Sequence, residues 1–117
     1  MDPNSYIDGY VLAVPIAQRE SYRQHAVDAA RVFRKYGALS LVETWGDDVP
    51  QGKVTSLPMA VKCQPDETVV FSWIVWPSKA VRDQGMAAAM ADPDIPKQMP
   101  FDGQRMIFGG FTVLVDA

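Results

Sequence analysis

The sequence of 117 residues has only one cysteine, Cys63, so it cannot form an internal disulfide. A lone thiol fits a reducing compartment, and we therefore expect a cytoplasmic protein. The first residues are acidic and polar, and they lack the basic and apolar regions of a secretory signal. No apolar run approaches the roughly 20 residues that a membrane-spanning helix needs. These absences argue against a secreted protein or one that spans a membrane.

Positive charge is also scarce, because 11 Lys and Arg residues face 14 Asp and Glu residues and the net charge is −3. Proteins that bind nucleic acids gain affinity from clustered basic side chains, so nucleic acid is not an expected partner. The sequence contains no basic amphipathic segment of the kind that predicts binding to a membrane surface. His25 is the only histidine. Asp47 and Asp48 follow one another in the chain, and no further candidate ligand lies near them at the spacing that a metal site needs. We therefore predict neither a metal site nor a cofactor.

Hydrophobic periodicity predicts a single domain over residues 1–117 with the order β-α-β-β-α-β. The clearest helix carries an apolar stripe that recurs every three or four residues, at Tyr22, Ala26, Ala29, Phe33 and Tyr36. The Asp8-Gly9 pair interrupts the first strand and suggests a β-bulge. Strands are predicted at 6–15, 38–45, 68–76 and 105–116, and helices at 18–36 and 79–91.

This order is typical of the α+β, ferredoxin-like split β-α-β fold, with a four-stranded antiparallel sheet and two helices on one face. A long connection over residues 46–67 separates the second and third strands and contains several Pro and Gly residues. Within it, residues 57–63 suit either a short strand or a helical turn, and we favour the turn.

The third and last strands are apolar on both sides, although two helices can cover only one face of a sheet. In the third strand Val69, Phe71, Trp73 and Val75 alternate with Val70, Ile74 and Trp76. Such a bare apolar face is rare on a monomer, so we expect two copies to pack sheet against sheet as a homodimer. The alternative is that the 46–67 connection folds over the second face.

Several long stretches resemble an uncharacterised bacterial family, a domain of unknown function in the dimeric α/β-barrel superfamily. They are ESYRQHA at 20–26, VETWGDDVP at 42–50, VFSWIVWPSK at 70–79, MPFDG at 99–103 and RMIFGGF at 105–111. The resemblance spans nearly the whole chain. It implies a ferredoxin-like protomer and a homodimer whose two sheets form a barrel, but it implies no reaction. The wider superfamily includes cofactor-free monooxygenases and isomerases, which is a likeness of fold alone.

Two titratable residues are candidates for catalysis. His25 flanks the apolar stripe of the first helix, where an imidazole can move protons near neutral pH or serve as a half-buried structural residue. Glu43 shares a strand face with Leu39, Leu41 and Trp45, so it needs a partner or a raised pKa. We expect that partner to be His25 or Arg82.

The aromatic residues Tyr22, Trp45 and Trp73, together with Arg82, are candidates for ligand binding, although core or interface packing explains aromatic residues equally well. Three functions stay open. The first is a homodimeric module that binds a small, largely apolar or aromatic molecule. The second is a cofactor-free enzyme that acts on such a molecule through His25 and Glu43. The third is an interaction dimer without a ligand.

Overall fold

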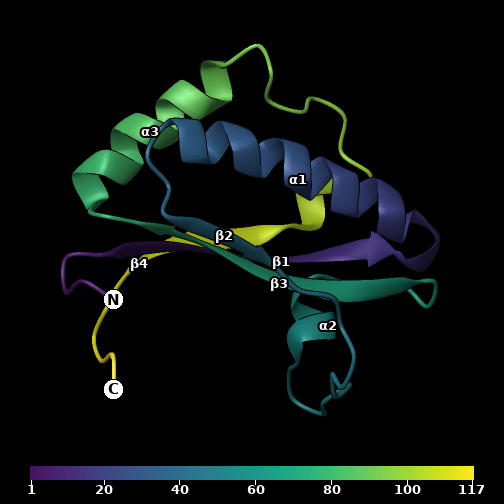
Figure 1. Ribbon diagram of the computed structural model, residues 1–117. Helices are drawn as coiled ribbons and strands as arrows, with labels where there is room; N and C mark the ends of the chain where they lie inside the picture. The colour runs from purple at the N-terminus through teal and green to yellow at the C-terminus, as the bar shows by residue number, and fades with distance from the viewer.

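A computed structural model describes residues 1–117 as an α+β arrangement of one four-stranded antiparallel sheet and three helices. Figure 1 shows α1 and α3 side by side on one face of the sheet and the short α2 on the other. The strands are β1 (Tyr6–Pro15), β2 (Ser40–Glu43), β3 (Glu67–Trp76) and β4 (Ile107–Thr112). The helices are α1 (Arg19–Lys35), α2 (Leu57–Ala60) and α3 (Lys79–Ala91), with short 3₁₀ turns at Ile16–Gln18 and Gly103–Arg105.

The strands lie in the order β2-β3-β1-β4, and every neighbouring pair is antiparallel. The register of β1 on β3 runs without interruption from the Tyr6–Trp76 pair to the Pro15–Glu67 pair. The bulge predicted at Asp8-Gly9 is therefore wrong. Gly9 instead lies opposite Gly109 of β4, where a Cβ would touch the Phe111 ring at 3.4 Å. Asp8 and Gly9 therefore interrupt the apolar pattern of the strand without interrupting its backbone pairing.

The main core lies between the sheet and the two long helices. Tyr22, Ala26 and Phe33 of α1 are buried there, which confirms the apolar stripe of the first predicted helix. Gly37 follows α1 with φ at 110°, a backbone conformation that glycine adopts without strain. Ser78 caps α3 by accepting a hydrogen bond from the backbone N–H of Val81. Local signals in the sequence thus set the end of α1 and the start of α3.

Two strands are shorter than predicted. The strand predicted at 38–45 is regular only over Ser40–Glu43, although the N–H groups of Thr44 and Gly46 still donate to carbonyls of β3. The strand predicted at 105–116 ends at Thr112, because Thr112 pairs with Tyr6, the first residue of β1. Beyond Thr112 the neighbouring strand offers no further backbone groups.

The long connection between β2 and β3 covers one end of the second face of the sheet. The helical turn favoured for this segment is confirmed as α2, whose N-cap Ser56 accepts a hydrogen bond from the Met59 N–H. Just after α2, Val61 packs on Ala13 and Val69, and all three are buried. The segment therefore forms a small second core under that end of the sheet.

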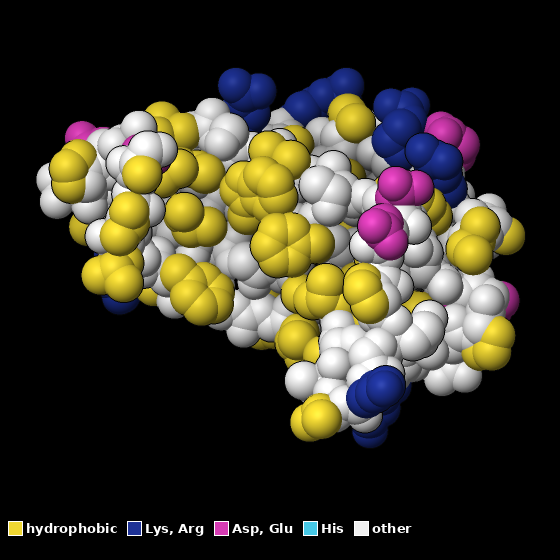
Figure 2. All heavy atoms as spheres, turned by 90° about the horizontal axis from the view of Figure 1, so that it is seen from below, with side chains coloured by type: hydrophobic (Ala, Val, Ile, Leu, Met, Phe, Trp, Pro, Cys, Tyr) yellow, Lys and Arg dark blue, Asp and Glu magenta, His cyan; other side chains and the backbone are white.

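The rest of the second face is apolar and exposed, and Figure 2 shows hydrophobic side chains across much of it. Phe71, Ile107 and Phe111 are 47%, 44% and 58% exposed. We call this surface the open face and define it by Ile7, Val11, Val42, Phe71, Trp73, Ile107 and Phe111. Next to it the tail after β4 exposes Leu114 and Val115. No helix of the structure has the length and apolar character required to cross a lipid bilayer.

Candidate functional site

A cleft of about 320 Å³ lies between α1 and the segment formed by β2 and the two residues that follow it. One wall is formed by residues of α1 that lie three or four positions apart and therefore share one face of the helix. The other wall is the side of β2 that faces the helices, together with the two residues after β2. The lining residues are Arg19, Tyr22, Arg23, Ala26, Val27 and Ala30 from α1, and Leu41, Glu43, Thr44 and Trp45 from the second wall. The cleft is therefore apolar in its middle and carries only a few polar groups.

Its central polar feature is a hydrogen bond from the Tyr22 hydroxyl to Oε1 of Glu43, with 2.6 Å between the oxygens. Burial raises the pKa of the Glu43 carboxyl, while hydrogen bonds from Tyr22 and Ser72 act in the opposite direction. Burial also raises the pKa of the Tyr22 phenol, and the nearby Glu43 raises it further. The phenol therefore keeps its proton, and Glu43 is an acid whose proton affinity is higher than that of an exposed carboxyl.

The rim of the cleft is basic. The guanidinium of Arg19 lies 5.5 Å from the centre of the Trp45 ring, in cation–π geometry. Arg23 forms an exposed ion pair of 3.0 Å with Glu20 on the same helix. Arg19 has no carboxylate within ion-pair distance, so its charge is directed to the cleft mouth and to solvent.

His25 lies beside the cleft without lining it. Its ring is half-buried, 6.1 Å from the Tyr22 ring and 5.8 Å from the Phe101 ring. Burial lowers the pKa of the imidazole, and a hydrogen bond with the backbone of Gln98 opposes that shift. Nδ1 is buried without a partner. The expected His25–Glu43 pair is wrong, because Tyr22, one helical turn earlier, occupies the position that reaches Glu43.

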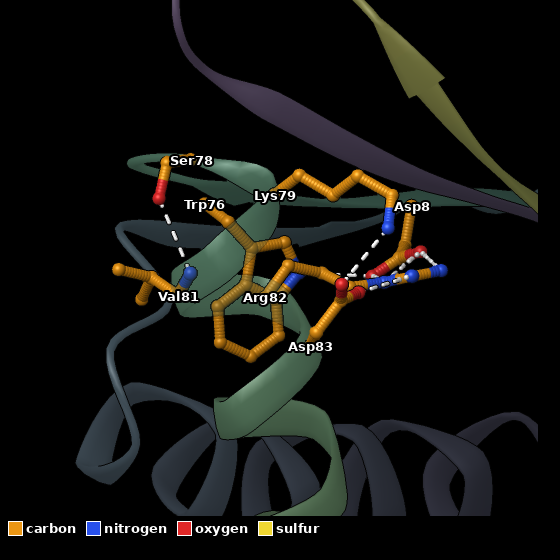
Figure 3. A network of polar contacts seen from close by, with 7 residues as sticks. All are labelled: Asp8, Trp76, Ser78, Lys79, Val81, Arg82 and Asp83. Atoms are coloured by element: carbon orange, nitrogen blue, oxygen red, sulfur yellow. Dashed lines mark hydrogen bonds and ion pairs between the residues drawn. The ribbon is translucent and has the colours of Figure 1, made fainter.

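Arg82 belongs to a different network on α3, shown in Figure 3. Its Nη2 lies 2.8 Å from Oδ1 of the buried Asp8, and its Nε lies 3.1 Å from both carboxylate oxygens. Asp8 also accepts a hydrogen bond of 2.9 Å from the indole of Trp76, and Arg82 pairs with Asp83 at 2.9 Å. The expected Arg82–Glu43 pair is therefore wrong. A side chain at Gly110 would collide with Tyr6 and Arg82, so the network is tightly enclosed.

Trp73 lies on the open face, away from the cleft, with its ring centre 5.6 Å from that of Phe71. Of the six residues singled out from the sequence, the structure brings Tyr22, Glu43 and Trp45 together in the cleft. It places His25 next to them, Trp73 on the opposite face and Arg82 on Asp8.

Comparison with known proteins gives a family for the chain. Residues 5–103 match the model of a family described as "Protein of unknown function (DUF1428)". The chain belongs to this family. It is 51% identical over 114 residues to the "Uncharacterized protein YbaA" of Escherichia coli K12, a match that covers 95% of this chain and 97% of that protein. The proteins of the same name from Escherichia coli O157:H7 and Shigella flexneri match to the same extent. The function of the family is unknown, and the resemblance to an uncharacterised bacterial domain family is confirmed.

Two residues of these sites were missed by the sequence reasoning. Arg19 lies three residues before Tyr22, which puts both side chains on one face of α1, and this spacing is a signal that could have found it. Asp8 alternates with Tyr6 and Tyr10 on the helix-facing side of β1, so it is an acid on an apolar strand face, as Glu43 is. The structure brings together no group of three or more His, Cys, Asp or Glu side chains suited to a metal ion.

Proposed function

We propose that the protein is a cytoplasmic homodimer in which each protomer binds a small, largely apolar or aromatic molecule in the cleft between α1 and β2. The observation that carries the proposal is the Tyr22–Glu43 pair inside an accessible, mostly apolar cleft. Ligand pockets are typically apolar surfaces with a few well-placed polar groups and a titratable residue of perturbed pKa.

The homodimer is supported by the open face. The order β2-β3-β1-β4, with α1 and α3 on the same face, supports our proposal of a ferredoxin-like protomer. In dimeric α/β barrels of that fold, the uncovered faces of two sheets pack against each other. Apolar burial contributes about 25 cal/mol per Å² before the costs of association. The exposed Phe71 and Phe111, and Leu114 of the tail, supply such apolar area.

A screen of thermal stability against a library of aromatic and aliphatic metabolites tests the binding proposal. A ligand that binds only the folded state raises the melting temperature, and the rise grows with the logarithm of the ligand concentration above its Kd. The variant Ala30→Leu narrows the cleft and should abolish the shift, whereas Gln24→Leu, on the exposed side of α1, should preserve it. Stabilisation that survives Ala30→Leu would place the ligand elsewhere, and a screen without any hit would favour an interaction dimer.

The second candidate is a cofactor-free enzyme that uses the same cleft. The observation that favours it is the raised pKa of Glu43, since carboxyls with raised pKa values serve as general acids or bases. In this geometry Tyr22 takes the place that the sequence had suggested for His25. An enzyme would lose turnover in Glu43→Gln while it still bound the ligand. A simple binding module would show no turnover in any variant.

A further inference from the structure

The geometry points to a small organic carboxylate as the ligand, with an apolar or aromatic body in the middle of the cleft and its carboxylate on Arg19. This inference rests on the proposed function, because it assumes that the cleft is a ligand site. It goes further by naming the chemical group that the site recognises.

The first argument is that Arg19 is a cation in the cleft without a partner. Four of the six arginines have a carboxylate within ion-pair distance, namely Arg23, Arg31, Arg82 and Arg105. Of the two others, Arg34 is exposed on the far part of α1, and only Arg19 lines the cleft. The Trp45 ring under its guanidinium fixes the position of the charge and leaves the planar N–H groups free to hydrogen-bond a carboxylate.

The second argument is the direction of α1. The helix begins at Arg19, so the positive end of its dipole lies at the same end of the cleft. Gln18, at the N-cap position, makes no hydrogen bond from its side chain to the first turn. The dipole and the guanidinium therefore favour negative charge at one place.

The third argument is the balance of charge across the cleft. Arg19, Arg23 and Glu43 are the charged residues of the lining, and the charge of Arg23 is already balanced by Glu20, which leaves Arg19 and Glu43. An ammonium ligand would gain from Glu43 and would be repelled by Arg19. A carboxylate ligand would gain from Arg19, and its repulsion by Glu43 is reduced because the half-buried acid takes up a proton more readily than an exposed one. The apolar residues between the two ends, including Ala26, Val27 and Leu41, suit a hydrocarbon body.

Calorimetric titration with matched probes tests the inference. The acids are benzoate, 3-phenylpropionate and octanoate, each compared with its primary amide, and 3-phenylpropylamine serves as the cationic probe. We expect at least one acid to bind the wild-type protein about tenfold more tightly than its amide, which is the effect of one charge-assisted hydrogen bond. Arg19→Gln should remove this preference while the amide still binds, Arg19→Lys should keep part of it, and Arg34→Gln should keep all of it.

The outcomes separate the inference from the proposed function. Equal affinities for acid and amide, tightest binding of the amine, or an acid preference that survives Arg19→Gln would overturn the carboxylate inference and leave the cleft as a ligand site. Failure of every probe to bind would overturn the inference together with the proposal that this cleft takes aromatic or apolar molecules. Because Arg19 is exposed and packs only on the rim, its replacement should not unfold the protein.

Discussion

The Tyr22 hydroxyl donates to Glu43 Oε1 over 2.6 Å, and this bond joins the first helix to the edge strand of the sheet. Glu43 has no cationic partner, which is unusual for an acid on an apolar strand face. The phenol supplies the polar contact that a guanidinium or imidazole would otherwise give. The stability of the fold and the proposed ligand chemistry therefore depend on the same pair of side chains.

The first prediction concerns the donor of this bond. Tyr22→Phe removes the hydroxyl and leaves a half-buried carboxyl with one partner fewer, so we expect a loss of about 1–2 kcal/mol in the free energy of unfolding. Urea denaturation measures it. Tyr10→Phe in β1 is the control, because the Tyr10 hydroxyl makes no hydrogen bond that the change could remove, in contrast to the hydroxyls of Tyr22 and Tyr36. An unchanged urea midpoint in Tyr22→Phe would show that the bond contributes nothing to stability.

The second prediction follows from the raised pKa of Glu43, whose ordinary value is 4.5. A folded-state pKa above the unfolded value means that the protonated acid stabilises the fold. This contribution is fully present below pH 4.5 and is lost as the pH rises through the folded-state pKa. Glu43→Gln keeps an acceptor for Tyr22 and cannot ionise. Its melting temperature relative to wild type should therefore rise between acidic and neutral pH. A difference that stays constant with pH would contradict the shift.

The third prediction concerns the Asp8–Arg82 pair. Arg82→Met leaves the buried Asp8 without its cation, and we expect a loss of about 3 kcal/mol in stability. Lys79→Met removes an exposed ion pair with Asp83 on the same helix and should cost under about 1 kcal/mol. Chemical denaturation of both variants gives the comparison. Equal losses of stability in the two variants would mean that the buried ion pair contributes no more to stability than the exposed one.

The fourth prediction concerns the contact of α3 with the sheet. Alanine favours helices over glycine by about 1 kcal/mol, yet a Cβ at Gly85 would lie 2.5 Å from the Tyr36 carbonyl oxygen and 2.6 Å from the Trp76 ring. Because neither atom can move freely, we expect Gly85→Ala to destabilise the fold by about 1–3 kcal/mol. Thermal unfolding measures this loss of stability. A Gly85→Ala variant more stable than the wild type would contradict the prediction, because it would mean that the packing around Gly85 has room for a methyl group.

The fifth prediction tests the open face. A charge at Phe111 or Phe71 should convert the proposed dimer into folded monomers, because a buried unpaired carboxylate is costly. Sedimentation of Phe111→Glu and Phe71→Glu at micromolar concentration measures the mass. Met90→Glu, on the exposed side of α3, is the matched control and should not change it. A wild-type protein that sediments as a monomer would refute the dimer outright.

Local signals in the sequence predicted much of the fold. The structure confirms the helix predicted over Lys79–Ala91. Both of its ends could be predicted because the Ser78 cap and the Asp92-Pro93 stop lie directly beside the helix in the sequence. The end of β4 depends on where β1 begins, a relation between residues about a hundred positions apart. The end of the last strand was therefore predicted four residues too late, at Asp116 instead of Thr112.

The candidate site was predicted only in part, because it too depends on relations between residues that are far apart in the sequence. Burial of Glu43 beside apolar neighbours follows from strand alternation, and this burial raises the pKa of its carboxyl. The choice of its partner depends on the height and rotation of α1 over the sheet, which periodicity does not give. Asp8 and Arg82 are 74 positions apart, and no spacing rule connects them.

The three tryptophans occupy three separate environments. Trp76 is fully buried in the core, Trp45 lines the cleft under Arg19, and Trp73 lies on the open face. Variants that keep a single indole would therefore act as independent optical probes. Emission from Trp76 would follow unfolding, quenching of Trp45 would follow ligand entry, and a spectral shift of Trp73 would follow contact between protomers.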